Sequence, residues 1–271
     1  MRAFVEMSDT DYHAHKAVGS TTLKYALQSM AKFKAAIDGR MKSKESDAFD
    51  LGKAAHAAVL EQNFDRYVCG PEVDKRTKEW KEFEEKNQGK ICLKESAYVQ
   101  VQGMYEAFYK HSLVPRITNN GKPENSFFVD IHGLEYKARP DYIVLEGERE
   151  KESAYIVDYK TAASIDLESC QRAIGNYGYD VSGAHYIQVV SAAIEKPITE
   201  YYWIFQEKDP PYECVVFRMD DECKERAIKC VKRLYEKIGQ CLKSGLWPGR
   251  YDARILDVDL PHYLTHQRSI N

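Results

Sequence analysis

The stretch Gly133–Thr161 constrains the fold more than any other part of this chain. Its composition predicts two β-strands, about Gly133–Leu145 and Ala154–Lys160, joined by a connection. The connection contains Gly147 and the charged run from Glu148 to Glu152, which cannot easily be buried. We therefore expect the chain to be organised around a pair of adjacent strands.

These two strands contain two acidic residues and one lysine, Asp141, Asp158 and Lys160. Side chains alternate between the faces of a strand, so Asp158 and Lys160 point to the same side. Asp141 follows Arg139-Pro140 and lies 17 positions before Asp158. Carboxylates on adjacent strands can share Mg²⁺, and a neighbouring lysine can stabilise charge that develops on a phosphate. The alternative is an edge hairpin with solvated charges, because Asp-x-Lys alone is common.

The bulk composition is that of an ordinary soluble globular protein, with 44% hydrophobic and 30% charged residues. The 271 residues suffice for one large domain or two small ones. A net charge of −3 neither indicates nor excludes nucleic-acid binding, because clustered acids offset basic residues elsewhere. No apolar run approaches the ~20 residues that span a membrane, and the N-terminus lacks the apolar core of a signal peptide. We expect a cytoplasmic protein that does not bind membranes.

The pattern along the chain shows no internal repeat and no convincing linker. We expect a single domain over residues 1–271, with an N-terminal helical part (about 1–120), a catalytic core (about 121–219) and a C-terminal helix and tail (220–271). Helical spacing of apolar residues predicts helices over 21–37, 96–113, 181–194 and 220–245, with Ser20 as the N-cap of the first. Strands are predicted over 123–131, 200–205 and 213–219.

Two further residues could reach the acids. His56 lies among glycine and alanine residues in Asp47–Phe64, where small side chains let a helix approach a sheet closely. A lone histidine in a helix is more often structural, but a neutral imidazole here could ligate a metal or hold a metal-bound water. Glu124 begins the predicted strand over 123–131 and could reach the same site, although a surface role is equally compatible with the sequence.

A polar segment over 71–90 interleaves basic and aromatic residues. Lys75, Arg76 and Lys78 precede Trp80 and Phe83, and such a mixture can grip a nucleic-acid strand. The segment is therefore a candidate DNA-binding region, and an exposed connection is the competing interpretation.

Several of these pieces occur in an order that resembles a known family. They are Ser20-Thr21-Thr22-Leu23-Lys24, Gly52-Lys53-Ala54-Ala55-His56 with Leu60-Glu61, Glu124-Asn125-Ser126, Arg139-Pro140-Asp141, Asp158-Tyr159-Lys160-Thr161, Tyr179-Asp180-Val181 with Tyr186, and Trp247-Pro248. The order resembles the nuclease domain of the RecE (exonuclease VIII) type, which belongs to the PD-(D/E)xK superfamily together with the RecB nuclease domain and lambda exonuclease.

The resemblance implies an α/β (α+β) fold with a central mixed β-sheet flanked by helices, the PD-(D/E)xK restriction-endonuclease-like core. It implies Mg²⁺-dependent 5′→3′ degradation of one strand of linear double-stranded DNA, with two ions per site and Mn²⁺ able to substitute. It further implies a phage or prophage origin, a ring-shaped homo-oligomer (trimer or tetramer) and a single-strand annealing protein as partner in recombination.

The resemblance also implies roles for individual residues. The metal ligands would be His56, Asp141, Asp158 and the backbone carbonyl of Tyr159. Lys160 would be the catalytic lysine, with Asp158, Asp141 and Glu124 as catalytic acids. Arg139 and Tyr186 would join Lys75, Arg76 and Lys78 in binding DNA.

One position departs from the family, and two alternatives to an active exonuclease remain. The family usually has glutamine four residues before the tyrosine equivalent to Tyr186, and here that residue is Ser182. Gln188 or a water could take over its role, or the position could contribute little. The chain could instead be an idle DNA-end-binding protein of the same fold. A CRISPR-associated type of nuclease with an iron–sulfur cluster is disfavoured, because the last four cysteines contain no C-x-x-C pair.

Overall fold

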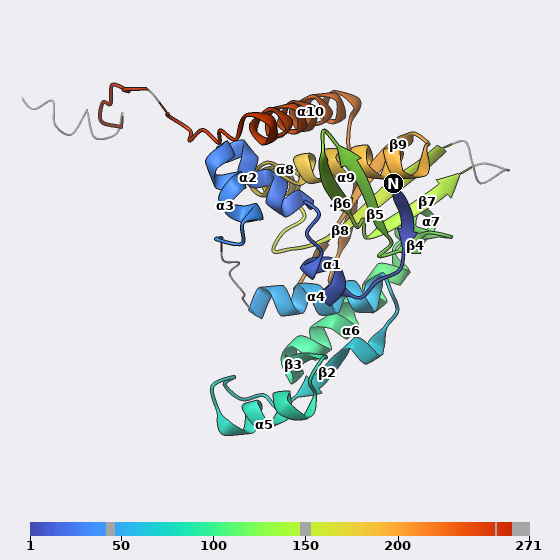
Figure 1. Cartoon of the computed structure of the whole chain (residues 1–271). Coiled ribbons are helices and arrows are strands. Elements are labelled where there is room, and N and C mark those ends of the chain that lie inside the picture. Colours follow the sequence, from blue (N-terminus) through green and yellow to red (C-terminus); the bar gives the residue numbers. More distant parts are fainter. Residues whose placement is uncertain (42–46, 147–152, 253, 262–271) are drawn as a thin grey trace, which may run out of the picture.

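The computed structural model describes residues 1–41, 47–146, 153–252 and 254–261 (Figure 1). The elements are, in chain order, β1 (Arg2–Val5), α1 (Asp9–Ala14), α2 (Ser20–Gln28), α3 (Met30–Ile37), α4 (Asp47–Val59), η1 (Phe64–Arg66), β2 (Tyr67–Gly70), α5 (Lys78–Lys86), β3 (Ile91–Lys94), α6 (Glu95–Lys110), α7 (Val114–Thr118), β4 (Lys122–Pro123), β5 (Ser126–Ile131), β6 (Leu134–Ala138), β7 (Tyr142–Glu146), β8 (Ser153–Ala162), α8 (Leu167–Tyr177), α9 (Tyr179–Ile194), β9 (Ile198–Glu207), β10 (Cys214–Arg218) and α10 (Asp221–Ser244). The predicted charged connection over 147–152 lies outside the described residues.

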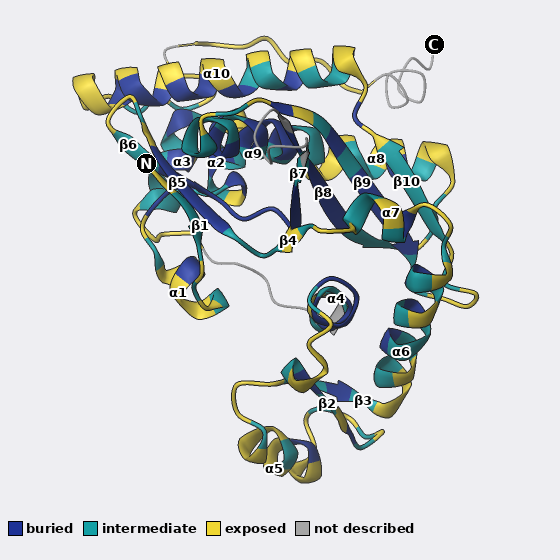
Figure 2. Ribbon diagram, turned by 90° about the vertical axis from the view of Figure 1, so that its right-hand side faces the viewer, coloured by how far each residue is buried: buried dark blue, intermediate teal, exposed yellow. Residues whose placement is uncertain are grey.

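The strands form a mixed α/β architecture. A five-stranded sheet has the order β10-β9-β8-β7-β4, in which β8 and β9 are parallel and the other neighbours are antiparallel. A three-stranded antiparallel sheet, β1-β5-β6, lies beside it, and β2 and β3 form a small parallel pair. Helices cover both faces of the five-stranded sheet (Figures 1 and 2). The expected mixed sheet flanked by helices is confirmed.

The predicted single strand Gly133–Leu145 is wrong, because it consists of two strands in different sheets. Ala138 at the end of β6 pairs with Phe127 of β5, whereas Tyr142 at the start of β7 pairs with Val157 of β8. Pro140 lies between them and has no N–H for a ladder hydrogen bond. The break directs the chain from one sheet into the other.

The predicted helix over 21–37 is also divided in two. Ser29 has extended backbone, with φ of −172°, and its side chain accepts a hydrogen bond from the backbone N–H of Lys32 as the N-cap of α3. Ser20 is the first residue of α2 and not its N-cap, which is Gly19. A hydroxyl that caps the next helix competes locally with a continuous helical ladder.

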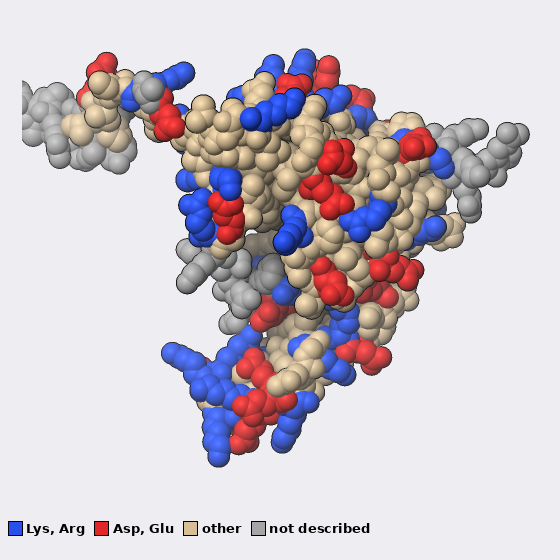
Figure 3. Space-filling model, in the orientation of Figure 1, with Lys and Arg blue, Asp and Glu red and all other residues tan. Residues whose placement is uncertain are grey.

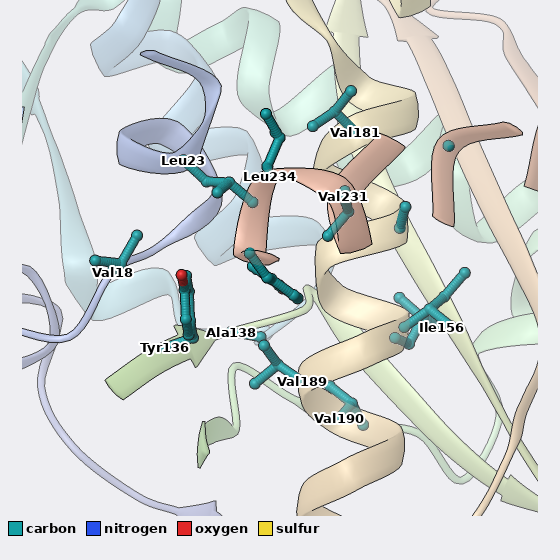
Figure 4. Packing of buried hydrophobic residues seen from close by; sticks show 14 of the residues in the cluster. Val18, Leu23, Tyr136, Ala138, Ile156, Val181, Val189, Val190, Val231 and Leu234 are labelled. Atoms are coloured by element: carbon teal, nitrogen blue, oxygen red, sulfur yellow. The ribbon is translucent and has the colours of Figure 1, made fainter. Parts of the chain in front are cut away.

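Alternation along β8 separates two hydrophobic cores. Ile156 packs in a core with residues of α2, α9 and α10, whereas Val157 and Tyr159 pack in a core with residues of α4 and α6. Figure 4 shows part of the first core, where Val181 and Val189 of α9 and Val231 and Leu234 of α10 gather. Burial of these apolar surfaces holds the helices against the sheet.

A smaller unit projects beyond α4 and α6. It consists of β2, α5 and β3 (residues 67–94), and we call it the α5 lobe (Figures 1 and 2). Tyr67 and Leu93 pack with Ala54, Ala57 and Val101 of the adjoining helices. In the described part of the chain, no helix is long and apolar enough to cross a membrane.

Candidate functional site

Asp141 lies where the chain passes between the two sheets. Pairing of β7 with β8 ends at Tyr142 and Val157, so the next N–H of β8 facing this side needs another acceptor. The buried Asp141 carboxylate supplies it, and its Oδ2 atom accepts a hydrogen bond from the Tyr159 N–H at 2.6 Å. The sheet junction therefore places an acid beside the middle of β8.

The side chains of Asp158 and Lys160 lie together on one face of β8. Lys160 Nζ is 2.7 Å from Asp158 Oδ2 and 3.8 Å from Asp141 Oδ2. It also donates a hydrogen bond to the Tyr159 carbonyl at 3.0 Å. Burial opposes the charge on the lysine, but Asp158 and Asp141 raise the pKa of Lys160 above its ordinary value. Burial raises the pKa of Asp158 to about 6, against the opposing effect of Lys160.

His56 reaches this cluster from α4, as the small residues around it led us to expect. Ala55 and Ala57 are fully buried, and a Cβ added at Gly52 would lie 3.9 Å from the Thr161 hydroxyl, so the helix runs close to β8. His56 Nδ1 lies 3.7 Å from Asp141 Oδ1. Burial, followed by the charge of Lys160, lowers the pKa of His56 to about 3. The imidazole is therefore neutral, the form that ligates metals.

Glu124 joins the same cluster directly after the short strand β4. Its backbone is left-handed, with φ of 51°, and its N–H donates a hydrogen bond to the Asp141 carbonyl at 3.2 Å. Such backbone strain is found preferentially at functional sites. Burial, followed by Asp141 and Glu61, raises the pKa of Glu124 to about 8. The carboxyl groups therefore crowd one another in a way that a cation would relieve.

The side chains of His56, Glu124 and Asp141 form a group that could hold a divalent ion after a small approach of their ligand atoms. Each offers one ligand atom, and the three atoms all lie within 4.8 Å of one another. Mg²⁺ holds its ligands at about 2.0–2.1 Å, so atoms that share one ion lie roughly 3–4 Å apart. Two carboxylates and one imidazole are together a ligand set for a divalent cation. Asp158 is not one of these three residues, and its carboxylate instead faces Lys160.

A cavity of about 420 Å³ opens above this cluster. It is lined by residues from α1, α4, β8 and α9, among them three that the sequence did not single out as site residues: Asp9, Glu61 and Tyr179. Arg66 pairs with both Asp9 and Glu61. Glu61 and Tyr179 belong to the ordered motifs that resemble the family, so the motifs indicated them as candidate site residues. Nothing local marks Asp9, which is far from the cluster in sequence.

Arg139 lines the cavity but is already well occupied. Its guanidinium donates hydrogen bonds to Ser126 Oγ at 2.9 Å, Asp9 Oδ1 at 2.9 Å and the Met7 carbonyl at 3.0 Å. It also lies 4.1 Å from the centre of the Tyr12 ring. In this structure the side chain therefore anchors α1 to the sheet, and its contact with DNA stays a prediction.

Tyr186 and Gln188 of α9 lie at two different cavities. Tyr186 lines the cavity, where Ser20 lies within hydrogen-bonding reach of its hydroxyl. Gln188 instead lines a different cavity, together with His132 and Tyr235. Gln188 therefore does not take the place of the family's usual glutamine, whose position is occupied by Ser182 in this chain.

Lys75, Arg76 and Lys78 lie in the α5 lobe and do not line the cavity. Each has an acidic partner: Asp50, Asp74 and Glu82, respectively. Figure 3 shows basic and acidic side chains mingled around α5. Trp80 is fully buried, so its ring is not available to stack on a base. DNA binding by the three cations stays a prediction.

All seven cysteines lie in the described part of the chain and are free thiols. None belongs to a group of metal-ligating side chains found among the described residues. The iron–sulfur alternative therefore has no ligand set in this structure.

Comparisons with known proteins bear on the fold and on the family. A crystal structure from Eubacterium rectale, named "Putative exonuclease", aligns with a TM-score of 0.62 and 11% identity over 98% of this chain and 100% of that one. At this identity the likeness shows the fold alone. A search among curated proteins found no match. The model of a family described as "PDDEXK-like domain of unknown function (DUF3799)" matches residues 19–253. This chain therefore belongs to that PDDEXK-like family.

Proposed function

We propose that this protein is a Mg²⁺-dependent 5′→3′ exonuclease. It degrades one strand of linear double-stranded DNA and leaves a 3′ single-stranded overhang for recombination by single-strand annealing. Membership of a PDDEXK-like family and the fold shared with a protein titled "Putative exonuclease" favour a nuclease. The direction of degradation, the ion and the biological role rest on the resemblance of the ordered motifs to RecE-type domains.

The observation that carries the proposal is the position of Lys160. Its ammonium group lies between the carboxylates of Asp158 and Asp141, beside the group formed by His56, Glu124 and Asp141. A domain that only bound DNA would not need a partly buried cation with two acids next to a metal-binding group. This arrangement disfavours the idle DNA-end-binding alternative.

The side chains have separable roles. His56, Glu124 and Asp141 would hold the ion, with Asp158 and the Tyr159 carbonyl as further ligands. A bound divalent ion supplies Lewis-acid polarisation of a phosphate and lowers the pKa of water. Lys160 keeps its proton, because Asp158 and Asp141 raise its pKa. It therefore acts as a fixed positive charge that stabilises the transition state, and not as a general base.

Incubation of the purified protein with end-labelled DNA tests the activity. We expect release of nucleotides from the 5′ end of a strand of a linear duplex in Mg²⁺ or Mn²⁺ and no release in EDTA. A covalently closed circle should stay intact. Label release from the 3′ end would refute the direction. Cleavage of the circle would refute the exonuclease, and no cleavage of any DNA would favour the end-binding alternative.

The assembly and the partner are part of the same proposal. A ring-shaped trimer or tetramer would enclose duplex DNA, and an annealing protein would receive the single strand. Sedimentation of the purified chain tests the ring, and a monomer at working concentration would contradict it. Retention of a co-expressed single-strand annealing protein on the tagged chain tests the partner.

A further inference from the structure

We propose that Tyr177 and Tyr179 form an aromatic step at the rim of the cavity, on which an unpaired base of the DNA strand stacks. This inference rests on the proposed nuclease function and names the form of substrate that the site takes. The two tyrosines flank Gly178, the single residue between α8 and α9. Tyr179 lies next to the proposed catalytic cluster (His56, Glu124, Asp141, Asp158 and Lys160), and neither tyrosine is among the proposed ligands of the ion.

The step leads from the catalytic lysine to solvent. Lys160 Nζ lies 5.4 Å from the centre of the Tyr179 ring, which lines the cavity. The Tyr179 and Tyr177 rings lie 5.5 Å apart with an interplanar angle of 33°. Tyr177 is 63% exposed. A base on Tyr177 would therefore belong to a nucleotide beyond the one whose phosphate contacts Lys160.

The backbone holds these rings in place. Gly178 is left-handed, with φ of 62°, and a Cβ at this position would come within 3.0 Å of the Lys24 side chain. Lys24 Nζ donates a hydrogen bond to the Tyr177 carbonyl at 2.9 Å, which satisfies a carbonyl at the end of α8. The Tyr179 ring also contacts Phe205 in the core, with the ring centres 6.3 Å apart. The Tyr179 ring and the backbone at Tyr177 are thus held in place without a ligand, which reduces the entropic cost of binding.

The Tyr177 ring is exposed and lies beside a site that we propose to act on DNA phosphates. A nucleic-acid base is therefore the favoured partner for stacking on it. Base–aromatic stacking tolerates every sequence, because each base has a π-face, and an aromatic ring can add to a basic site in this way. Within a duplex those faces are covered by neighbouring bases, so only a terminal or unpaired base can use the step. The step therefore selects a frayed strand end.

Fluorescence of 2-aminopurine tests the step without hydrolysis. The probe is a linear duplex with 2-aminopurine as the 5′-terminal base, bound in Ca²⁺ in place of Mg²⁺. Wild-type protein and Tyr177→Phe should quench the probe on binding. Tyr177→Ala should lose the quenching and bind about tenfold more weakly. Tyr251→Ala is the matched control, because Tyr251 is also exposed (57%) but lies in the C-terminal tail.

A second substrate separates stacking from other contacts. A duplex with an abasic 5′ end should bind wild type and Tyr177→Ala equally. Equal quenching by wild type and Tyr177→Ala would overturn the inference, and so would equal losses in Tyr177→Ala and Tyr251→Ala. A change of sedimentation in Tyr177→Ala without loss of quenching would assign the ring to a protein contact instead. Hydrolysis by wild type in Mg²⁺ is measured separately, so failure of the proposed function is distinguishable from failure of the step.

Discussion

The proposed catalytic cluster and the α5 lobe both contain lysine and acidic side chains, but the surroundings of these charges differ. The Lys160 side chain is 21% exposed and lies against two buried carboxylates. The Arg76 and Lys78 side chains are each 90% exposed and pair with acids within four residues of them in sequence. Charges in a poorly solvated site interact strongly, whereas exposed pairs contribute about 0–1 kcal/mol. Burial, and not charge content, distinguishes the candidate site.

Removal of one buried acid should give the largest effect. Asp158→Ala should abolish Mg²⁺-dependent hydrolysis of linear DNA and leave the fold intact, because it removes a proposed carboxylate ligand and the acid that pairs with Lys160. Initial rates with circular dichroism check both parts. Asp158→Asn is the matched variant, since it removes the charge with little change of shape. If Asp158→Ala turned over DNA as fast as wild type, the buried acids of the cluster would be no more important for activity than the exposed acids of the lobe.

Loss of the partly buried cation should give the next largest effect. Lys160→Ala should lower kcat by about 10²-fold or more, the effect of removing one electrostatic stabiliser. DNA affinity should change little, because one phosphate contact is a small part of the total. Single-turnover rates and binding in Ca²⁺ separate the two. Weak binding with normal cleavage at saturation would instead make Lys160 a phosphate anchor, comparable to the lobe cations.

Two histidines provide an internal control for the metal site. His56→Ala should weaken Mn²⁺ binding and Mg²⁺ activation with nearly unchanged melting temperature. His185 is fully buried and hydrogen-bonded to the Tyr235 hydroxyl at 2.8 Å, so His185→Ala should lower stability by about 0.5–3 kcal/mol. Calorimetric Mn²⁺ titration and thermal unfolding of both variants make the comparison. Wild-type metal affinity with a large loss of stability in His56→Ala would return His56 to the core.

The raised carboxyl pKa predicts a pH dependence of the metal-free protein. Glu124 has a pKa of about 8 in the folded state against an ordinary value of 4.5. Between these values Glu124 binds more protons in the folded state than in the unfolded state, so its contribution to stability falls as pH rises from about 4.5 through about 8. Thermal unfolding in EDTA between pH 5 and 9 measures this fall. Glu124→Gln should make the curve flatter, and an unchanged slope would contradict the assignment.

The smallest effect is expected in the α5 lobe. If Arg76 and Lys78 bind phosphates, replacing both by glutamine should lower the slope of log K against log[salt] for duplex DNA by about 0.9 for each phosphate that is no longer neutralised. The kcat at saturation should not change, because neither residue lines the cavity. Binding isotherms at several salt concentrations give the slope. An unchanged slope would make the lobe a solvated surface whose charges satisfy one another.

Local pattern alone was sufficient for part of the site. Period-two alternation places Asp158 and Lys160 on one face of β8, and their 2.7 Å contact follows from that spacing. Small residues around His56 indicated a helix close to a sheet, because little side-chain volume separates the two backbones. These features depend on residues near one another in sequence, so periodicity and side-chain size were enough to predict them.

Tertiary structure alone determined how distant residues meet. Pro140 breaks the predicted strand between two sheets, and this break places Asp141 opposite the unpaired edge of β8. Arg139 binds Asp9 of α1, 130 residues away in sequence, which no local pattern reports. Whether a charge is buried depends on the elements that pack over it. The sequence by itself therefore determined which residues are candidates for the chemistry, and only the packing of sheets and helices determined which charges are removed from water and brought together.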